Sequence, residues 1–141
     1  MKKIIKLITA VCLLFAMTAL AVACTKTDTD LLWESAIHQT DMEFGNGAKT
    51  ITVKVEAGEK SVTFTLHTDK DTVGAALMEH GLIAGEEGQF GLYLKKANGI
   101  TADYDIDQSY WAFYINGETA LTGVDGAEVK EGAAYSLVYT K

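Results

Sequence analysis

The sequence feature that most constrains the fold is a strict alternation of apolar and polar residues in two neighbouring segments. Apolar residues occupy every second position of residues 51–55 and 62–66, with threonine or lysine between them. Such alternation is typical of strands that bury one face and expose the other. Because only residues 57–60 separate the segments, they are predicted to pair as an antiparallel hairpin with one face on the core.

A short helix is predicted after this hairpin. Asp71 or Thr72 can cap its first turn, and Gly81 lies where a left-handed residue commonly ends a helix. Gly74 costs about 1 kcal/mol relative to alanine inside a helix, which indicates close packing against the sheet. One face of this helix would carry Val73, Ala76, Leu77 and His80.

The rest of the chain alternates strand candidates with turns rich in glycine, asparagine and aspartate. These candidates are residues 90–95, 99–102, 110–115 and 134–140. Two strands, one helix and then several strands predict an α+β fold of the β-grasp type, in which one short helix packs on an antiparallel or mixed sheet. A β-sandwich, the alternative, would leave the helix unexplained.

The N-terminal segment combines three lysines, an uncharged apolar stretch over residues 7–22, and Ala-Val-Ala-Cys at residues 21–24. This pattern is typical of a lipoprotein signal peptide over residues 1–23, after which Cys24 accepts a diacylglyceryl group. A transmembrane anchor is the alternative, but about 16 apolar residues fall short of the roughly 20 that span a bilayer. We therefore expect export and lipid anchoring through Cys24, with the protein facing outside the cytoplasm.

Removal of the signal peptide would leave the mature chain acidic and without a free cysteine. Of the two cysteines, Cys12 would leave with the signal and Cys24 would carry lipid, so no disulfide or thiolate site is expected. The loss of three lysines would move the net charge from −7 to −10. Such a charge disfavours nucleic acid and anionic lipid headgroups as partners.

The mature chain is predicted to have two parts. Residues 24–48 are expected to form the lipidated cysteine and a tether, in which residues 25–30 are polar and disordered. Residues 31–37 are expected to pack on the domain or on the membrane surface. Residues 49–141 are expected to form one domain, which we expect to be monomeric.

The sequence contains no convincing catalytic or metal-binding motif. Asp103, Asp105 and Asp107 form a D-x-D-x-D run, but Gln108 and Tyr114 replace the glycine and glutamate of an EF-hand loop, which favours an acidic solvated turn. Nucleophile-elbow and phosphate-binding motifs are absent from the sequence. No enzyme, cofactor or metal site is therefore expected. The histidines are scattered at positions 38, 67 and 80.

The aromatic segment at residues 110–117 is the strongest candidate for a binding site. In a strand, Trp111 and Phe113 would share one face with Ile115, whereas Tyr114 would lie on the other face. Trp111 and Phe113 can serve simply as core residues. Tyr114 and the turn beyond it, with Asn116, are better placed to contact a ligand.

Around this segment the sequence resembles a known family. The resemblance rests on Tyr-Trp-Ala-Phe-Tyr-Ile-Asn-Gly-Glu at residues 110–118, Gly-Val-Asp at 123–125, Val-Lys-Glu-Gly at 129–132, Tyr-Ser-Leu-Val-Tyr-Thr at 135–140, and the helix 72–77 with its glycine at 81. Over residues 49–141 the chain is similar to the transcobalamin-like C-terminal domain family.

The resemblance implies a β-grasp module that binds a soluble ligand without catalysis. In the vitamin carriers of the family this module caps cobalamin, and bacterial members are often lipoproteins or cell-surface modules. The strand of Trp111 and the loop Leu121–Val124 match the region that faces the corrin ring. The resemblance and the strand pattern together select as ligand-binding residues Trp111, Tyr114, Asn116, Leu121, Thr122, Gly123 and Val124.

The carriers build the other half of their site from a large helical domain, which has no counterpart in this sequence. A partner protein, such as a membrane transporter or a second binding domain, would have to supply that wall. The favoured function is a non-catalytic, lipid-anchored domain that captures cobalamin or another corrinoid for uptake. The alternative is a surface protein–protein interaction or structural module with no small-molecule ligand.

Overall fold

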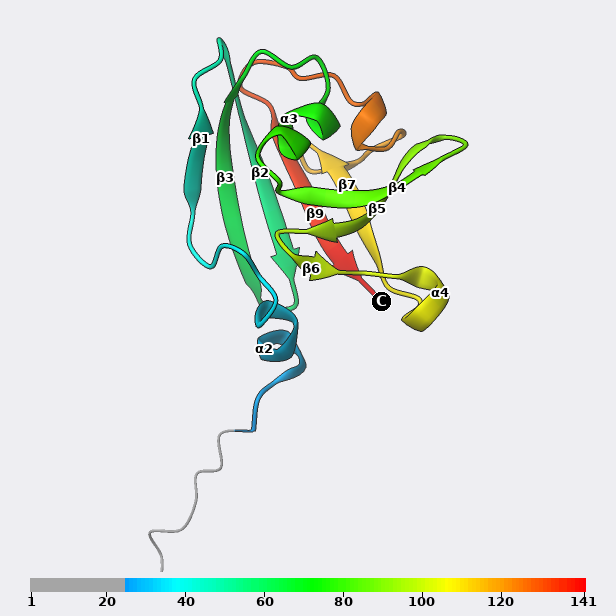
Figure 1. The fold of residues 1–141 in the computed structure, drawn as a ribbon. Helices are drawn as coiled ribbons and strands as arrows, with labels where there is room; N and C mark the ends of the chain where they lie inside the picture. The colour runs from blue at the N-terminus through cyan, green and yellow to red at the C-terminus, as the bar shows by residue number, and fades with distance from the viewer. Residues whose placement is uncertain (1–24) are drawn as a thin grey trace, which may run out of the picture.

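The computed structural model describes residues 25–141 (Figure 1). The predicted signal peptide and the predicted lipidation site, Cys24, lie outside the described residues. Within the described part of the chain, each helix is too short or too polar to cross a membrane.

Within residues 25–141, the larger of two sheets has six strands in the order β1-β3-β2-β9-β7-β8. β2 and β3 form the predicted antiparallel hairpin, whose turn places Gly58 at φ +62°. β9 pairs with β2 in parallel and with β7 in antiparallel orientation, so the sheet is mixed. The strands are β1 (Met42–Gly45), β2 (Lys49–Ala57), β3 (Lys60–Thr68), β7 (Tyr110–Ile115), β8 (Glu118–Thr119) and β9 (Ala134–Thr140).

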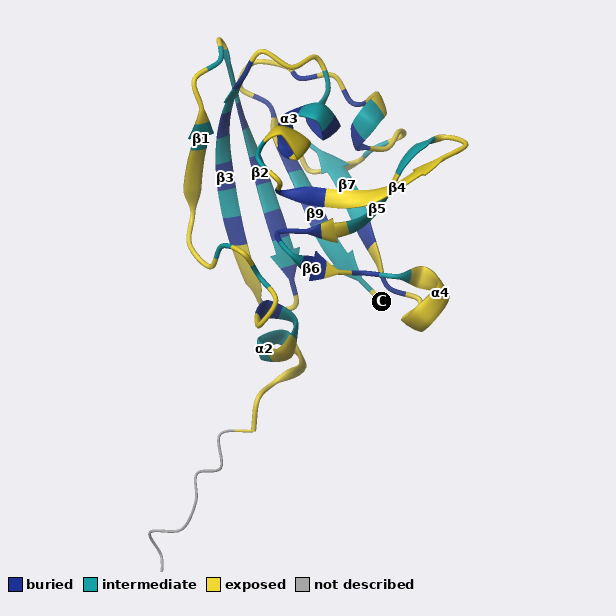
Figure 2. Cartoon of the chain, viewed as in Figure 1, coloured by how far each residue is buried: buried dark blue, intermediate teal, exposed yellow. Residues whose placement is uncertain are grey.

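The alternation seen in the sequence becomes the two faces of the central strands. Val53 and Val55 of β2 and Phe64 and Leu66 of β3 are fully buried, whereas the residues between them are only partly covered (Figure 2). Burial of each such side chain contributes about 1.5–3 kcal/mol. The core therefore lies on one face of the larger sheet.

A three-stranded antiparallel sheet and a short helix cover that buried face (Figure 1). The predicted α+β fold with one short helix packed on the sheet is confirmed. β5 and β6 overlap the predicted strands, but β1, β4 and β8 were not predicted. β4 shows no apolar alternation, and β1 and β8, with four and two residues, are too short to give a clear pattern. The additional elements are α3 (Val73–Glu79), β4 (Ile83–Gly88), β5 (Gly91–Ala97) and β6 (Ile100–Thr101).

Helix α3 begins and ends as predicted, but one of its glycines has a different neighbour. Thr72 accepts a hydrogen bond from the Ala75 amide at 3.2 Å, and Gly81 follows the helix at φ +66°. Gly74 was predicted to pack against the sheet, but the atoms nearest to its Cβ position lie elsewhere. It lies against Asp125 in the 3₁₀ helix η1 (Val124–Gly126), which leaves no room for a Cβ atom.

The expected tether is largely part of the domain. Helix α2 (Asp28–Trp33) is capped by Thr27, and Trp33 is 4% exposed and donates its indole N–H to the Ala57 carbonyl at 2.8 Å. Strand β1 continues the larger sheet by pairing with β3. Residues 28–45 are therefore ordered on the domain because a capping box starts the helix and a tryptophan fixes it to the core.

Acid is expected to fray α2 selectively. A hydrogen bond from Lys60 at 2.6 Å, with the capping bonds from Thr27, lowers the pKa of Asp30 from 3.8 to about 2. Because the folded pKa is lowered, this stabilisation is complete above about pH 4 and is lost as the pH falls toward 2. Amide exchange measured by NMR should show faster exchange in α2 over this window. The variant Asp30→Asn should lack this pH dependence, and equal profiles for the two proteins would contradict the assignment.

Candidate functional site: an aromatic groove between two sheets

A groove of about 210 Å³ opens where β5 of the smaller sheet passes β7 of the larger one. We call it the aromatic groove. Its walls are apolar or aromatic, which is the usual composition of small-molecule sites. It is lined by Leu92, Tyr93, Leu94, Tyr110, Trp111, Phe113, Gly123 and Val124.

Ring packing in the larger sheet holds the aromatic wall of the groove in place. The ring of Trp111 meets that of Tyr139 edge to face, with centroids 5.8 Å apart. Phe113 stacks on the buried ring of Tyr135 at 6.1 Å. Both pairs lie within the usual range for favourable aromatic contacts. The groove is therefore preformed on a rigid strand.

The indole N–H of Trp111 is an unusual polar group in this wall. Trp111 is 7% exposed, and its Nε1 atom is buried and donates to no acceptor among the described residues. A buried donor without a partner costs about 1–3 kcal/mol. A water molecule or an acceptor group on a ligand would recover that free energy.

Asp125 fixes the opposite side of the groove. Its carboxylate accepts a hydrogen bond from the Leu92 amide at 2.8 Å and lies close to Gly91. This contact ties the start of β5 to η1. Because Gly123 and Val124 adjoin Asp125 in sequence, the same contact holds them near the start of β5, where they line the groove.

Two exposed apolar side chains lie in the loops that precede β5 and η1. Phe90, between β4 and β5, is 98% exposed and borders a hollow of about 330 Å³ that shares Leu92 and Tyr93 with the groove. Leu121, in the loop before η1, is fully exposed. These side chains extend the apolar surface beyond the groove itself.

The structure brings three of the predicted ligand-binding residues together. Trp111, Gly123 and Val124 line the aromatic groove. A neighbouring hollow of about 370 Å³ contains Asn116, Leu121 and Thr122, together with β8 residues. Contact of any of these residues with a ligand stays a prediction.

Two of the predicted ligand-binding residues, Tyr114 and Asn116, do not line the aromatic groove. Tyr114 lies on the face of β7 opposite Trp111, as strand alternation requires. Asn116 has φ +49° in the turn after β7, and its side-chain oxygen accepts a hydrogen bond from the Ala134 amide at 2.9 Å. Asn116 therefore has a structural role in joining β7 to β9.

Sequence reasoning missed the β5 wall of the groove. Leu92 and Leu94 are two residues apart, but Tyr93 lies between them and two lysines follow, so the apolar alternation is weak. In the structure both leucines are only partly buried. The signal that could have identified them is the pair of leucines two residues apart within a predicted strand. Leu92 and Leu94 contribute to the groove because β5 packs beside β7, and the sequence pattern does not show that packing.

The acidic run, predicted to be a solvated turn, is exposed to solvent as expected but forms a short helix, α4 (Tyr104–Asp107). Asp103 caps it by accepting the Asp105 amide at 3.1 Å. Hydrogen bonds from Ser109, more than the nearby Lys141, lower the pKa of Asp107. Across residues 25–141, no group of three or more histidine, cysteine, aspartate or glutamate side chains is arranged to hold a metal ion.

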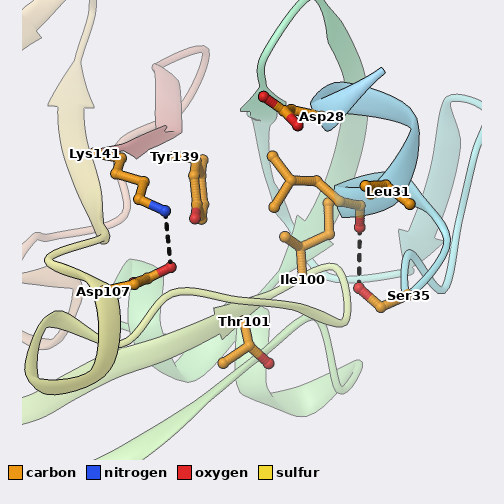
Figure 3. Close-up of a pocket in the computed structure, with 9 residues that line it drawn as sticks. Asp28, Leu31, Ser35, Ile100, Thr101, Asp107, Tyr139 and Lys141 are labelled. Atoms are coloured by element: carbon orange, nitrogen blue, oxygen red, sulfur yellow. Dashed lines mark hydrogen bonds and ion pairs between the residues drawn. The ribbon is translucent and has the colours of Figure 1, made fainter. Parts of the chain in front are cut away.

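A second and larger cavity, of about 490 Å³, lies between α2, β6, α4 and the end of β9. We call it the α2 pocket. Leu31, Ile100 and Tyr139 line the gap, and the ion pair between Asp107 and Lys141, at 3.4 Å, closes one side of it (Figure 3). Four separate segments build this pocket, so the sequence pattern did not reveal it.

Comparisons with known proteins found one matching family and solved structures of similar fold. Residues 70–137 match a family described as a domain of unknown function, DUF4430. No curated protein matches the sequence. Haptocorrin in complex with Cbi is 18% identical, with a TM-score of 0.54, over 70% of this chain and 26% of the haptocorrin chain. At this identity the likeness shows the fold alone, and the chain spans about a quarter of haptocorrin.

A crystal structure from Ruminococcus gnavus ATCC 29149 is more similar. That protein, described as a candidate metal-binding protein, is 33% identical, with a TM-score of 0.63. The match covers 67% of this chain and 98% of the R. gnavus chain. The chain therefore belongs to the same family as this R. gnavus protein.

Proposed function

We propose that this protein is an exported, lipid-anchored binding protein whose aromatic groove captures a soluble small molecule without catalysis. The observation that carries the proposal is the preformed groove between β5, β7 and η1, with Trp111 and Phe113 in its wall. Concave apolar surfaces with a few polar groups are typical of small-molecule sites. The indole N–H of Trp111 is a buried polar group in this wall with no acceptor among the described residues.

The groove is large enough for only part of a typical ligand. Its volume of about 210 Å³ is below the roughly 300–1,000 Å³ of most ligand pockets. The exposed side chains of Phe90 and Leu121 would extend the contact area. A partner protein, such as a membrane transporter or a second binding domain, would supply the remaining wall.

Within this proposal, a corrinoid such as cobalamin is the first ligand to test. The shared fold with haptocorrin, whose structure was determined in complex with Cbi, supports this choice. The sequence resemblance to the transcobalamin-like C-terminal domain family points to the same ligand class. A large ring system also suits a shallow groove that covers one edge of its ligand.

We do not extend the description of the R. gnavus protein to metal binding by this chain. The described residues contain no cluster of three potential ligands. Calcium and zinc should therefore be included as controls in the binding experiments. A stoichiometric complex with either ion would contradict this expectation and support a metal site in the protein.

Lipid anchoring belongs to the proposal as well. It rests on the signal pattern that ends at Cys24, which predicts retention on the outer side of the cytoplasmic membrane. Mass spectrometry of the N-terminal peptide from membrane-purified protein should show a diacylglyceryl group on Cys24. An unmodified peptide that begins upstream of Cys24 would contradict this part.

The groove can be tested by blocking its mouth at Gly123. This residue has ordinary φ, and a Cβ atom there would meet nothing within 4 Å, so a large side chain can be introduced without strain. In Gly123→Trp the affinity of residues 25–141 for cobinamide or cobalamin should fall at least about tenfold, or 1.4 kcal/mol. Calorimetry and corrin absorbance would measure it, with Gly123→Ala as the matched control.

The outcomes separate the candidate functions. Absence of corrinoid binding at high micromolar concentration would remove the corrinoid as a ligand of the isolated domain. Equal affinities of Gly123→Trp and Gly123→Ala would place any binding outside the aromatic groove. Capture of a membrane protein by a domain that binds no small molecule would favour the alternative, a protein–protein interaction module.

A further inference from the structure

One end of the larger sheet gathers α2, α4 and the C-terminus (Figure 1). Trp33 of α2 bonds to Ala57 at the end of β2, and Asp30 pairs with Lys60 at the start of β3, at 2.6 Å. β9 is parallel to β2, so its last residues reach the same end, where Lys141 pairs with Asp107 of α4. We call this surface the α2–α4 end.

The α2–α4 end combines exposed apolar side chains with neutralised acidic ones. Leu31 of α2 is 52% exposed and Ile106 of α4 is 82% exposed, and Tyr104 is also exposed. The two helices flank the α2 pocket, which Leu31 and Asp107 line, and Tyr104 and Ile106 are exposed on α4 outside the pocket. Most carboxylates at this end have a lysine partner, in the pairs Lys26–Glu34, Lys60–Asp30, Lys95–Asp103 and Lys141–Asp107.

The chain leaves little free length between this end and the predicted lipid. The capping box fixes the backbone from Thr27, and Trp33 holds α2 on the core. Three Cα–Cα steps separate Cys24 from Thr27, which span at most about 11 Å. If Cys24 carries lipid, as the proposed function states, the N-terminal end of α2 must remain close to that distance from the membrane surface.

We propose that the α2–α4 end rests on the bilayer, with Leu31, Tyr104 and Ile106 in the headgroup region and the α2 pocket open toward it. Tyrosine and aliphatic side chains are favourable at this depth. The acidic chain suits a zwitterionic leaflet better than an anionic one, because anionic headgroups would repel it. The proposal rests on lipid anchoring at Cys24, and not on the identity of the ligand.

This orientation has a consequence for the aromatic groove. β7 begins beside α4 and runs away from the α2–α4 end, so the turn after it and the Leu121 loop lie at the far end of the strand. The loop would therefore face away from the bilayer. A soluble ligand or a partner could reach the Leu121 loop while the protein is anchored, whereas Tyr110 and Trp111, at the start of β7, place the groove nearer the bilayer.

The test compares a label at each end of the lipidated protein. Ile106→Cys and Leu121→Cys each introduce one thiol that can be labelled with the environment-sensitive dye NBD after Cys24 has been lipidated. On phosphatidylcholine vesicles the Ile106→Cys label should shift to the blue and lose about half of its emission to nitroxide-bearing lipids, as expected for a group in the interface. The Leu121→Cys label should match its spectrum in lipid-free protein.

Water-like emission from both labels on vesicle-bound, lipidated protein would overturn the proposal, and so would equal quenching at both positions. Mass spectrometry of the N-terminal peptide reports lipidation separately. If Cys24 carries no lipid, the same variants with Cys24→Ser can be held on vesicles through a histidine tag in place of residues 1–23. Quenching confined to Ile106→Cys would then support the surface although lipidation failed, and its absence would contradict it.

Discussion

Replacing Trp33 with alanine is expected to lower the free energy of unfolding of residues 25–141 by about 3–5 kcal/mol. Trp33 is among the buried core residues, and its indole N–H satisfies the Ala57 carbonyl at 2.8 Å. The substitution removes a large apolar side chain and leaves a cavity between α2 and the larger sheet. Urea denaturation followed by circular dichroism would measure the change in free energy.

Two companion variants separate the causes of this loss. Trp33→Phe keeps most of the ring but removes the donor to Ala57, so it should cost about 1–3 kcal/mol. Leu31→Ala, on the exposed side of the same helix, should change the unfolding free energy by less than about 0.5 kcal/mol. A Trp33→Ala protein as stable as Leu31→Ala would show that α2 is not part of the folded core.

The variant Gly74→Ala is expected to be destabilising although alanine favours helices. A Cβ atom at residue 74 would collide with the Asp125 carboxylate and lie 3.2 Å from the backbone of Val124 and Asp125. Overpacking of this kind costs about 1–3 kcal/mol, which exceeds the gain of about 1 kcal/mol from helix propensity. Because Asp125 also holds the Leu92 amide, amide exchange at Leu92 should become faster.

A double-mutant cycle with Asp125→Ala identifies the collision as the cause. In the Asp125→Ala background the side chain that Gly74→Ala would displace is gone, so the cost of the second substitution should shrink or change sign. Coupled residues in contact usually show interaction free energies of about 0.5–3 kcal/mol. Strictly additive effects would show that Gly74 and Asp125 act independently.

The parts of the fold that follow from local sequence were predicted correctly. The β2–β3 hairpin follows from apolar alternation on both sides of a short turn, and α3 follows from Thr72 as its cap and Gly81 beyond its end. The bounds of β7 and β9 also match the prediction. These features depend on residues that are close in sequence, so a linear pattern is sufficient to specify them.

The candidate site was predicted only in part. Trp111, Gly123 and Val124 do line one groove, but Tyr114 lies on the other face of its strand and Asn116 stabilises a turn. The expected tether also proved to contain α2 and β1. Residues 31–37 were expected to pack on the domain or on the membrane surface, and Trp33 does pack on the core. The polar residues on either side of this segment give no local sign of α2 or β1.

The sequence by itself determined the two alternating strands and the capped helix, and it predicts the lipid anchor at Cys24. Only the tertiary structure decided where the aromatic groove and the α2 pocket lie, because their walls come from strands, helices and loops that are far apart in sequence. Leu92 meets Val124 through the hydrogen bond to Asp125, and Tyr139 meets Leu31 across the α2 pocket. Such cavities depend on how the two sheets and the helices pack, and that packing is a sum of many non-local contacts that no short pattern encodes.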